Sequence, residues 1–309
     1  MVLVPMISSP VRRAALPFIF VTIVLDVLAL GIIIPVLPRL IQQFMGGDTA
    51  SAAGVIGIFG TMFAAMQFIC SPILGVLSDQ FGRRPVILTA LFGLGFDYIL
   101  MALAPSVGWL FLGRVISGIT GASYTTAGAY IADVTPPEKR AAGYGMIGAA
   151  WGLGFVLGPA LGGFLGDIDP RLPFWVAASL TLLNATYGLF ILPESLPPDH
   201  RKPAKWSRAN PLGSLRLLRS HSGLLGLAGV YLLYFVAHQV MPSVFVLYTN
   251  FRYGWDGKTV GLALAAAGIG NILVQGFLVR RMVARFGERR SMLTGLCFGV
   301  IGSAVYGLA

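Results

Sequence analysis

The stretch GVLSDQFGRRP, residues 75–85, lies between two long apolar segments and decides how the chain folds. The segment before it is AAGVIGIFGTMFAAMQFICSPIL (52–74), and the segment after it is VILTALFGLGFDYILMALA (86–104). Each has about the 20 residues that a helix needs to cross roughly 30 Å of hydrocarbon. A short polar turn between two such segments predicts a hairpin of membrane-spanning helices.

The composition of the whole chain agrees with this hairpin. Of its 309 residues, 56% are hydrophobic and only 11% are charged, whereas a soluble domain has about 25% charged residues. The sequence therefore predicts an all-α polytopic membrane protein. We predict nine spans, at residues 17–37, 52–74, 85–104, 108–131, 141–165, 173–192, 223–248, 258–280 and 291–309.

The basic residues indicate how these spans are oriented. The chain has 22 lysines and arginines and a net charge of +10, which could suggest nucleic-acid binding. Most of them lie in alternate loops, on one side of the predicted membrane, while the opposite side holds only Arg39, Arg171, Arg252 and Lys258. Because cytoplasmic loops are enriched in Lys and Arg, we predict a cytoplasmic N-terminus and no nucleic-acid partner.

A change of composition divides the chain. Residues 193–222 are rich in Pro, Lys and Arg and form the longest polar segment, so we predict a six-helix N-terminal half (1–192), a cytoplasmic central loop (193–222) and an incomplete C-terminal half of three helices (223–309). QFGRRPVILT (80–89) and RFGERRSMLT (285–294) match without gaps, as expected for the parallel repeats of two-halved transporters. The chain is then expected to be a fragment or a natural short form.

Four ionisable residues lie inside predicted spans: Asp26, Asp97, Arg114 and His238. Charges at membrane depth are costly and usually face an internal cavity, and burial favours the neutral carboxyl group, which can then exchange protons. We predict a proton-coupling and substrate path, to which Gln239, Asn271 and Gln275 add polar contacts. In the alternative interpretation Asp97 pairs structurally with Arg114 and His238 is a hydrogen-bonded packing residue.

The hairpin and the fifth span each carry a small-residue pattern. In the hairpin, Gly75 and Gly82 permit a tight turn, and Asp79 with Arg83 and Arg84 could form a charged gating latch, or could serve topology alone. In the fifth span, GLGFVLGPALGG (152–163) places three glycines on one face, which predicts close helix packing with or without sliding, and its proline removes a backbone donor and could kink the helix. These residues are Gly154, Gly158, Pro159 and Gly162.

Several motifs together resemble the major facilitator superfamily. GVLSDQFGRRP resembles its hairpin motif between helices 2 and 3, FLGRVISGITGA (111–122) its helix 4 motif, and GLGFVLGPALGG its helix 5 antiporter motif. LDVLALGIIIPVLPRL (25–40) resembles helix 1 of drug/proton antiporters, especially the tetracycline-efflux group. The resemblance implies a major facilitator fold with nine of twelve helices present, and proton-coupled efflux of drug-like or tetracycline-like molecules by alternating access, hence antibiotic resistance.

The chain departs from that group at two positions. The group has an acidic residue in helix 9, near where this chain has Gly299, and a histidine in helix 8, where it has Asn271. The cargo is therefore left open. Two alternatives to drug/proton antiport remain: a proton-coupled metabolite or sugar transporter on the same fold, and a fragment that does not transport.

We expect a monomer in the bacterial inner membrane whose partners are lipid, protons and a small molecule. Apart from the coupling proton we expect no cofactor, no metal and no enzymatic activity, since three histidines and two cysteines form no catalytic or metal-binding spacing.

Overall fold

A computed structural model describes residues 9–121, 124–136, 140–201, 203, 206, 209–211 and 222–308 of the chain. The regular structure within these residues is helical. The chain divides into two compact units, Met1–Ala265 and Ala266–Ala309, and each is described by itself. The predicted division at 193–222 is a separate hypothesis and stays a prediction.

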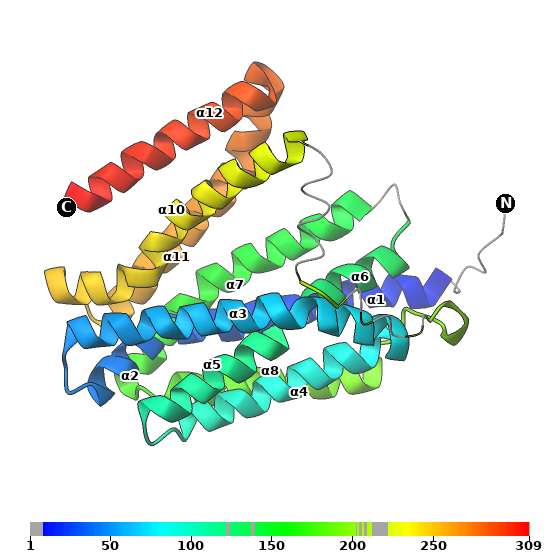
Figure 1. Cartoon of the computed structure of the whole chain (residues 1–309), viewed down its shortest axis with the longest axis horizontal. Coiled ribbons are helices and arrows are strands. Elements are labelled where there is room, and N and C mark those ends of the chain that lie inside the picture. Colours follow the sequence, from blue (N-terminus) through cyan, green and yellow to red (C-terminus); the bar gives the residue numbers. More distant parts are fainter. Residues whose placement is uncertain are drawn as a thin grey trace. The chain divides into compact units, whose positions relative to one another are not determined.

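The first unit contains the helices that correspond to the first seven predicted spans and the start of the eighth (Figure 1). They are α1 (Ser9–Ile33), α2 (Leu37–Phe44), α3 (Thr49–Phe81), α4 (Arg83–Ala102), α5 (Val107–Gly121), α6 (Tyr124–Val134), α7 (Arg140–Ile168), α8 (Leu172–Ile191), the short 3-10 helix η2 (Pro198–His200), α10 (Ser222–Tyr253) and the part of α11 (Gly257–Leu273) up to Ala265.

The second unit contains the end of α11, the π-helical turn η4 (Val274–Leu278) and α12 (Val279–Leu308). Gly287 interrupts α12 with φ 77° and ψ 167°, so two helices meet there. The helix that begins with α11 therefore continues to the residues just before Gly287. This helix extends beyond the predicted span 258–280 into the basic segment that follows the apolar residues.

The predicted membrane-spanning character is confirmed for most of the predicted spans. Seven helices in the described part of the chain are long and apolar enough to cross a membrane, and α11 is a shorter apolar helix. The predicted span 108–131 contains α5 and α6, with 15 and 11 described residues. Residues 122 and 123 between them lie outside the described part.

Local chemistry determines where α3 begins and ends. Asp48 precedes it, and its carboxylate accepts hydrogen bonds from the backbone N–H groups of Ala50 and Ser51, at 3.0 and 3.3 Å, which is the usual N-cap. At the other end Gly82 has φ 107° and ψ 160° and separates α3 from α4. That region is open essentially to glycine alone, so Gly82 lets two helices follow each other without a loop.

Glycines bring α7 against α1, which runs beside it in Figure 1. A Cβ atom added to Gly154 would lie 2.6 Å from Val27 Cγ1, and one added to Gly158 would lie 2.6 Å from Gly31 Cα. One added to Gly162 would overlap the carbonyl oxygen of Ile32. The predicted glycine face of this helix is therefore a packing face in contact with backbone, and Pro159 lies within a continuous α7.

Candidate functional site

Asp97 lies in the middle of α4 and is 1% exposed. Its Oδ2 accepts a hydrogen bond from the hydroxyl of Ser117 on α5, at 2.5 Å, while Oδ1 accepts none from the described groups. The guanidinium of Arg114 lies instead over the ring of Phe63 on α3, 4.6 Å from its centroid, in a cation–π contact. Asp97 and Arg114 therefore interact electrostatically, but among the described residues they do not form an ion pair.

Three predicted site residues lie within electrostatic range of one side chain that the sequence did not single out. The buried hydroxyl of Tyr98, beside Asp97 on α4, interacts electrostatically with Asp26, Asp97 and Arg114. Asp26, on α1, is 8% exposed. The structure therefore gathers ionisable groups from α1, α4 and α5 within the first unit.

A further polar contact joins α1 to α8. The amide of Asn184, which is 1% exposed, donates to the carbonyl oxygen of Thr22 at 3.2 Å. This buried amide was also missed from the sequence, because a single Asn in an apolar segment gives no periodic signal.

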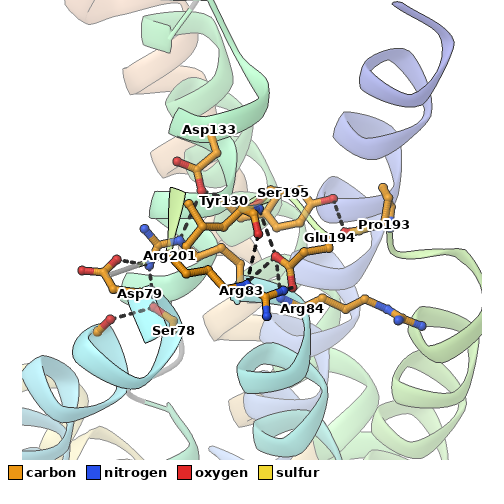
Figure 2. Close-up of polar contacts among 12 residues, drawn as sticks. Ser78, Asp79, Arg83, Arg84, Tyr130, Asp133, Pro193, Glu194, Ser195 and Arg201 are labelled. Carbon is orange, nitrogen blue, oxygen red and sulfur yellow. Dashed lines mark hydrogen bonds and ion pairs between the residues drawn. The ribbon is translucent and has the colours of Figure 1, made fainter. Parts of the chain in front are cut away.

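The hairpin charges form a larger cluster than predicted (Figure 2). Arg83 forms ion pairs with Asp79 at 2.7 Å and with Asp133, at the end of α6, at 3.2 Å. Its guanidinium also donates to Ser78 Oγ at 2.6 Å. Arg83 thus ties the end of α3 to the end of α6, which is more than a topological role requires.

Glu194, which follows α8, is the second centre of this cluster. Its Oε1 accepts from the backbone N–H groups of Arg83 at 2.9 Å and Leu196 at 3.0 Å, and its Oε2 lies 3.8 Å from Arg201. A carboxylate at the start of α4 is favourable because helix N-termini carry free N–H groups and partial positive charge. Glu194 was not predicted, because it lies 111 residues from Arg83 along the chain.

We call this set of residues the hairpin cluster. Two contacts complete it, since Ser195 donates to Asp133 at 3.2 Å and the Tyr130 hydroxyl donates to the carbonyl oxygen of Pro193 at 2.9 Å (Figure 2). Its members are Ser78, Asp79, Arg83, Arg84, Tyr130, Asp133, Pro193, Glu194, Ser195 and Arg201.

A second polar group, the turn cluster, lies near the opposite end of α3. Arg39 on α2 pairs with Asp167, near the end of α7, at 2.8 Å, and donates to the carbonyl oxygen of Trp255 at 3.0 Å. Asp167 also accepts from the backbone N–H groups of Gly257 and Lys258, at 3.0 and 2.8 Å. The turn cluster (Arg39, Asp167, Trp255, Gly257 and Lys258) thereby fixes the first turn of α11 to α2 and α7.

The start of α11 has its own cap as well. The hydroxyl and the backbone N–H of Thr259 both bond to Asp256 and lower the pKa of that carboxyl. Small residues beside the cap allow close approach, because a Cβ on Gly163 would overlap the Gly257 carbonyl oxygen and one on Gly261 would overlap that of Pro159. The Pro159 carbonyl and Gly163 therefore face α11, while the Pro159 ring and the three glycines Gly154, Gly158 and Gly162 face α1.

The remaining predicted site residues belong to α3, α10, α11 and η4. His238 is exposed on α10 and stacks on Tyr234, with centroids 5.7 Å apart, and Gln239 beside it is also exposed. Asn271 belongs to the second unit, and the side chain of Gln275 lies outside the described part. Gly75 has open space where a Cβ would stand, so it is not a close-packing position.

No group of three His, Cys, Asp or Glu side chains able to hold a metal ion occurs within the described ranges. Among the described residues, the candidate functional groups are the site around Asp97 and the hairpin and turn clusters.

Comparison with known proteins gives a consistent result. A sequence model described as Major Facilitator Superfamily matches residues 19–309. The chain is 38% identical to tetracycline resistance protein, class C, of Escherichia coli, over 96% of this chain and 74% of the relative. It is 29% identical to multidrug resistance protein 2 of Bacillus subtilis, over 89% of this chain and 68% of the relative.

Solved structures show the same fold. The human organic anion transporter MFSD10 (TETRAN) superimposes with a TM-score of 0.70 at 23% identity, covering 94% of this chain and 83% of that one. A bacterial homologue of the human lysosomal transporter Spinster, in an inward-facing and unoccupied conformation, gives 0.68 at 21% identity, covering 90% and 64%.

Proposed function

Because this chain belongs to the Major Facilitator Superfamily, whose members are transporters and not enzymes, we propose that it is a proton-coupled antiporter. It exports small drug-like or tetracycline-like molecules across the bacterial cytoplasmic membrane by alternating access. The tetracycline and multidrug resistance proteins among its relatives support this class of cargo, and the particular compound is left open by Asn271 and Gly299.

The observation that carries the proposal is the buried Asp97 carboxyl. A carboxylate kept for stability alone would be expected to pair with the nearest cation, because an unpaired charge at membrane depth is costly. Here the Arg114 guanidinium lies on Phe63 and Asp97 bonds to a neutral hydroxyl. Asp97 can therefore become neutral without leaving a broken ion pair.

Antiport follows from competition at that carboxyl group. A cationic cargo, or one bound as a metal chelate, is stabilised by the ionised form of Asp97, and a proton that neutralises it favours release. Tyr98 lies within electrostatic range of both Asp97 and Asp26, so we assign Tyr98 and Asp26 to the rest of the proton path. His238 and Gln239 are assigned to the cargo path on α10, together with Asn271 and Gln275 from the second unit.

The orientation and the division of the chain are part of the proposal. We place the N-terminus and the hairpin cluster in the cytoplasm, because the basic residues concentrate in those loops. Residues 1–192, 193–222 and 223–309 then form the first half, the central loop and part of the second half. The protein is taken to work as a monomer.

The two polar clusters then supply closures at the two ends. The hairpin cluster ties α3, α4, α6 and the segment after α8, so it holds the cytoplasmic end of the first half in one arrangement. The turn cluster ties α2 and α7 to the first turn of α11 and closes the outer end. Alternating access requires that the two clusters do not open together.

Flux in everted vesicles tests the function. With an imposed pH gradient, acidic inside, vesicles containing the protein are expected to accumulate tetracycline or a cationic dye, and to release it when the gradient is collapsed. A sugar or metabolite that moves in the proton's own direction while drugs do not move would identify a different transporter on the same fold.

Weakening the two clusters is expected to have opposite effects on accessibility. In a background with Cys70 and Cys297 replaced by alanine, Asp167→Asn should increase labelling of Ala160→Cys by an impermeant thiol reagent from outside. Asp79→Ala should instead increase labelling of Val76→Cys from the cytoplasm and slow the transport cycle.

Substrate binding should persist in both variants, because neither carboxylate lies at the Asp97 site. Asp169→Asn is the matched control for Asp167, since Asp169 bonds to Arg171 within its own turn at 2.6 Å, and it should leave labelling unchanged. Loss of binding in either variant, or opening at the same end in both, would contradict closure by these clusters.

A further inference from the structure

The contact between α4 and α5 is built around the Asp97 carboxyl group. Asp97 and Met101 are four residues apart on α4, and Gly113 and Ser117 are four apart on α5, so each pair shares one helix face. A Cβ on Gly113 would lie 3.0 Å from Asp97 Oδ1 and 2.5 Å from Met101 Cγ. The glycine therefore leaves the volume that the carboxyl group occupies.

Ser117, one turn further along α5, contacts two oxygen atoms. Its Oγ lies 2.5 Å from Asp97 Oδ2 and 2.7 Å from the carbonyl oxygen of Gly113, and the residue is 3% exposed. A hydroxyl has one proton, so it can donate to only one of these oxygens at a time. The Gly113 carbonyl can only accept, whereas a carboxyl group accepts when ionised and can donate when neutral.

These contacts allow two hydrogen-bond arrangements without movement of heavy atoms. When Asp97 is ionised, Ser117 donates to Oδ2. When Asp97 is neutral, its own proton is donated to Ser117 Oγ, and the serine proton turns to the Gly113 carbonyl, as Ser and Thr commonly do within helices. No proton leaves the pair during the turn of the hydroxyl.

We propose that Ser117 is a positioning residue that holds the Asp97 carboxyl in one place in both protonation states by exchanging its hydrogen-bond acceptor. The proposal rests on the proposed function, since it concerns the carboxyl group assigned to proton exchange. Its consequence is that proton binding and release need only a hydroxyl rotation of about one rotamer step, rather than a rearrangement of α4 and α5.

Other ionisable groups affect Asp97 electrostatically, without a hydrogen bond to it. Arg114 on α5 and Tyr98 on α4 interact with it electrostatically, and Asp26 on α1 reaches Tyr98. Arg114 is held by Phe63, so it supplies a steady field and not a direct bond. Ser117 is the described group whose hydrogen bond to Asp97 must change when the proton moves.

The test is Ser117→Ala measured by the pH dependence of transport in the vesicle assay. Removing the hydroxyl takes away a donor to the ionised carboxylate, and hydrogen bonds to charged groups are stronger than those between neutral groups. The pH midpoint of proton-driven transport is therefore expected to move to higher pH by about one unit. Ser117→Thr, which keeps the hydroxyl, should restore the midpoint.

Thr120→Val is the matched control on the same helix. The Thr120 hydroxyl bonds to the carbonyl oxygens of Ile116 and Ser117, at 3.0 and 3.2 Å, and to no carboxyl group. Its loss should leave the pH midpoint in place even if it lowers stability, so the comparison separates positioning from packing.

An infrared measurement gives a second readout that does not need transport. In the purified protein at acidic pH, the carbonyl band of neutral Asp97 is identified by its absence in Asp97→Asn. It should move to higher wavenumber in Ser117→Ala, because the carboxyl proton loses its acceptor. Unchanged band position together with equal pH midpoints in Ser117→Ala and Thr120→Val would overturn the proposal, whereas absence of proton-driven transport in the unmodified protein would overturn the proposed function instead.

Discussion

Asp97→Asn is expected to abolish proton-driven efflux while leaving membrane insertion nearly unchanged. Asparagine has the shape of aspartate and can still accept the hydrogen bond of Ser117, so the contact between α4 and α5 remains. It cannot bind and release a proton at neutral pH, however, and the coupling step is lost. The measurement is drug accumulation in everted vesicles under an imposed pH gradient, with the amount of inserted protein determined in parallel.

The control for Asp97 is a carboxylate of the same kind outside the membrane. Asp199 is exposed in η2, and Asp199→Asn should transport normally. If Asp97→Asn transported as well as Asp199→Asn, Asp97 would be a structural carboxyl group and the coupling site would have to be sought elsewhere, with Asp26 as the next residue to test.

Gly162→Ala is expected to have the second largest effect, through packing. The added methyl group would overlap the carbonyl oxygen of Ile32 on α1, and backbone atoms cannot move aside as a flexible side chain can. Overpacking of this kind costs about 1–3 kcal/mol, and it would push apart the helices that pack through Gly154 and Gly158. Thermal unfolding in detergent and transport in vesicles should both show the loss.

Gly148→Ala provides a control on the same helix. Gly148 has open space where its Cβ would stand, and alanine favours a helix over glycine, so this variant should be as stable as the parent or slightly more so. Equal stability of the two variants would mean that α7 and α1 separate easily, and the glycine face would then be a sliding surface instead of a packed one.

Much of the fold could be predicted from the sequence because membrane-spanning helices have a simple hydropathy pattern. Apolar segments of fixed length, with polar turns such as that at Gly82, predicted most of the helices and the superfamily. The extent of one helix was less predictable. The helix after Gly257 continues into basic residues, to just before Gly287, because a hydropathy pattern detects the apolar part of a helix and not its polar continuation.

The candidate site was predictable only in part. Asp26, Asp97 and Arg114 stood out as charges in apolar segments, but a pairing partner cannot be recognised by charge alone. Ser117 was not predicted because serine is common in membrane helices and its partner, Asp97, is 20 residues away in sequence. Glu194 and Asp167 escaped because each acts on the start of a helix that is distant along the chain, and such contacts leave no periodic pattern.

Gly82 and Gly287 have similar backbone conformations, with φ 107° and ψ 160° at the first and φ 77° and ψ 167° at the second. These angles are those that amino acids of the opposite handedness adopt without strain. At Gly287 no atom occupies the space of an added Cβ, so chirality itself is the obstacle to substitution. A D-alanine introduced there by semisynthesis should be accepted where L-alanine is not, and the same backbone handedness occurs at the third residue of both matching segments, QFGRRPVILT and RFGERRSMLT.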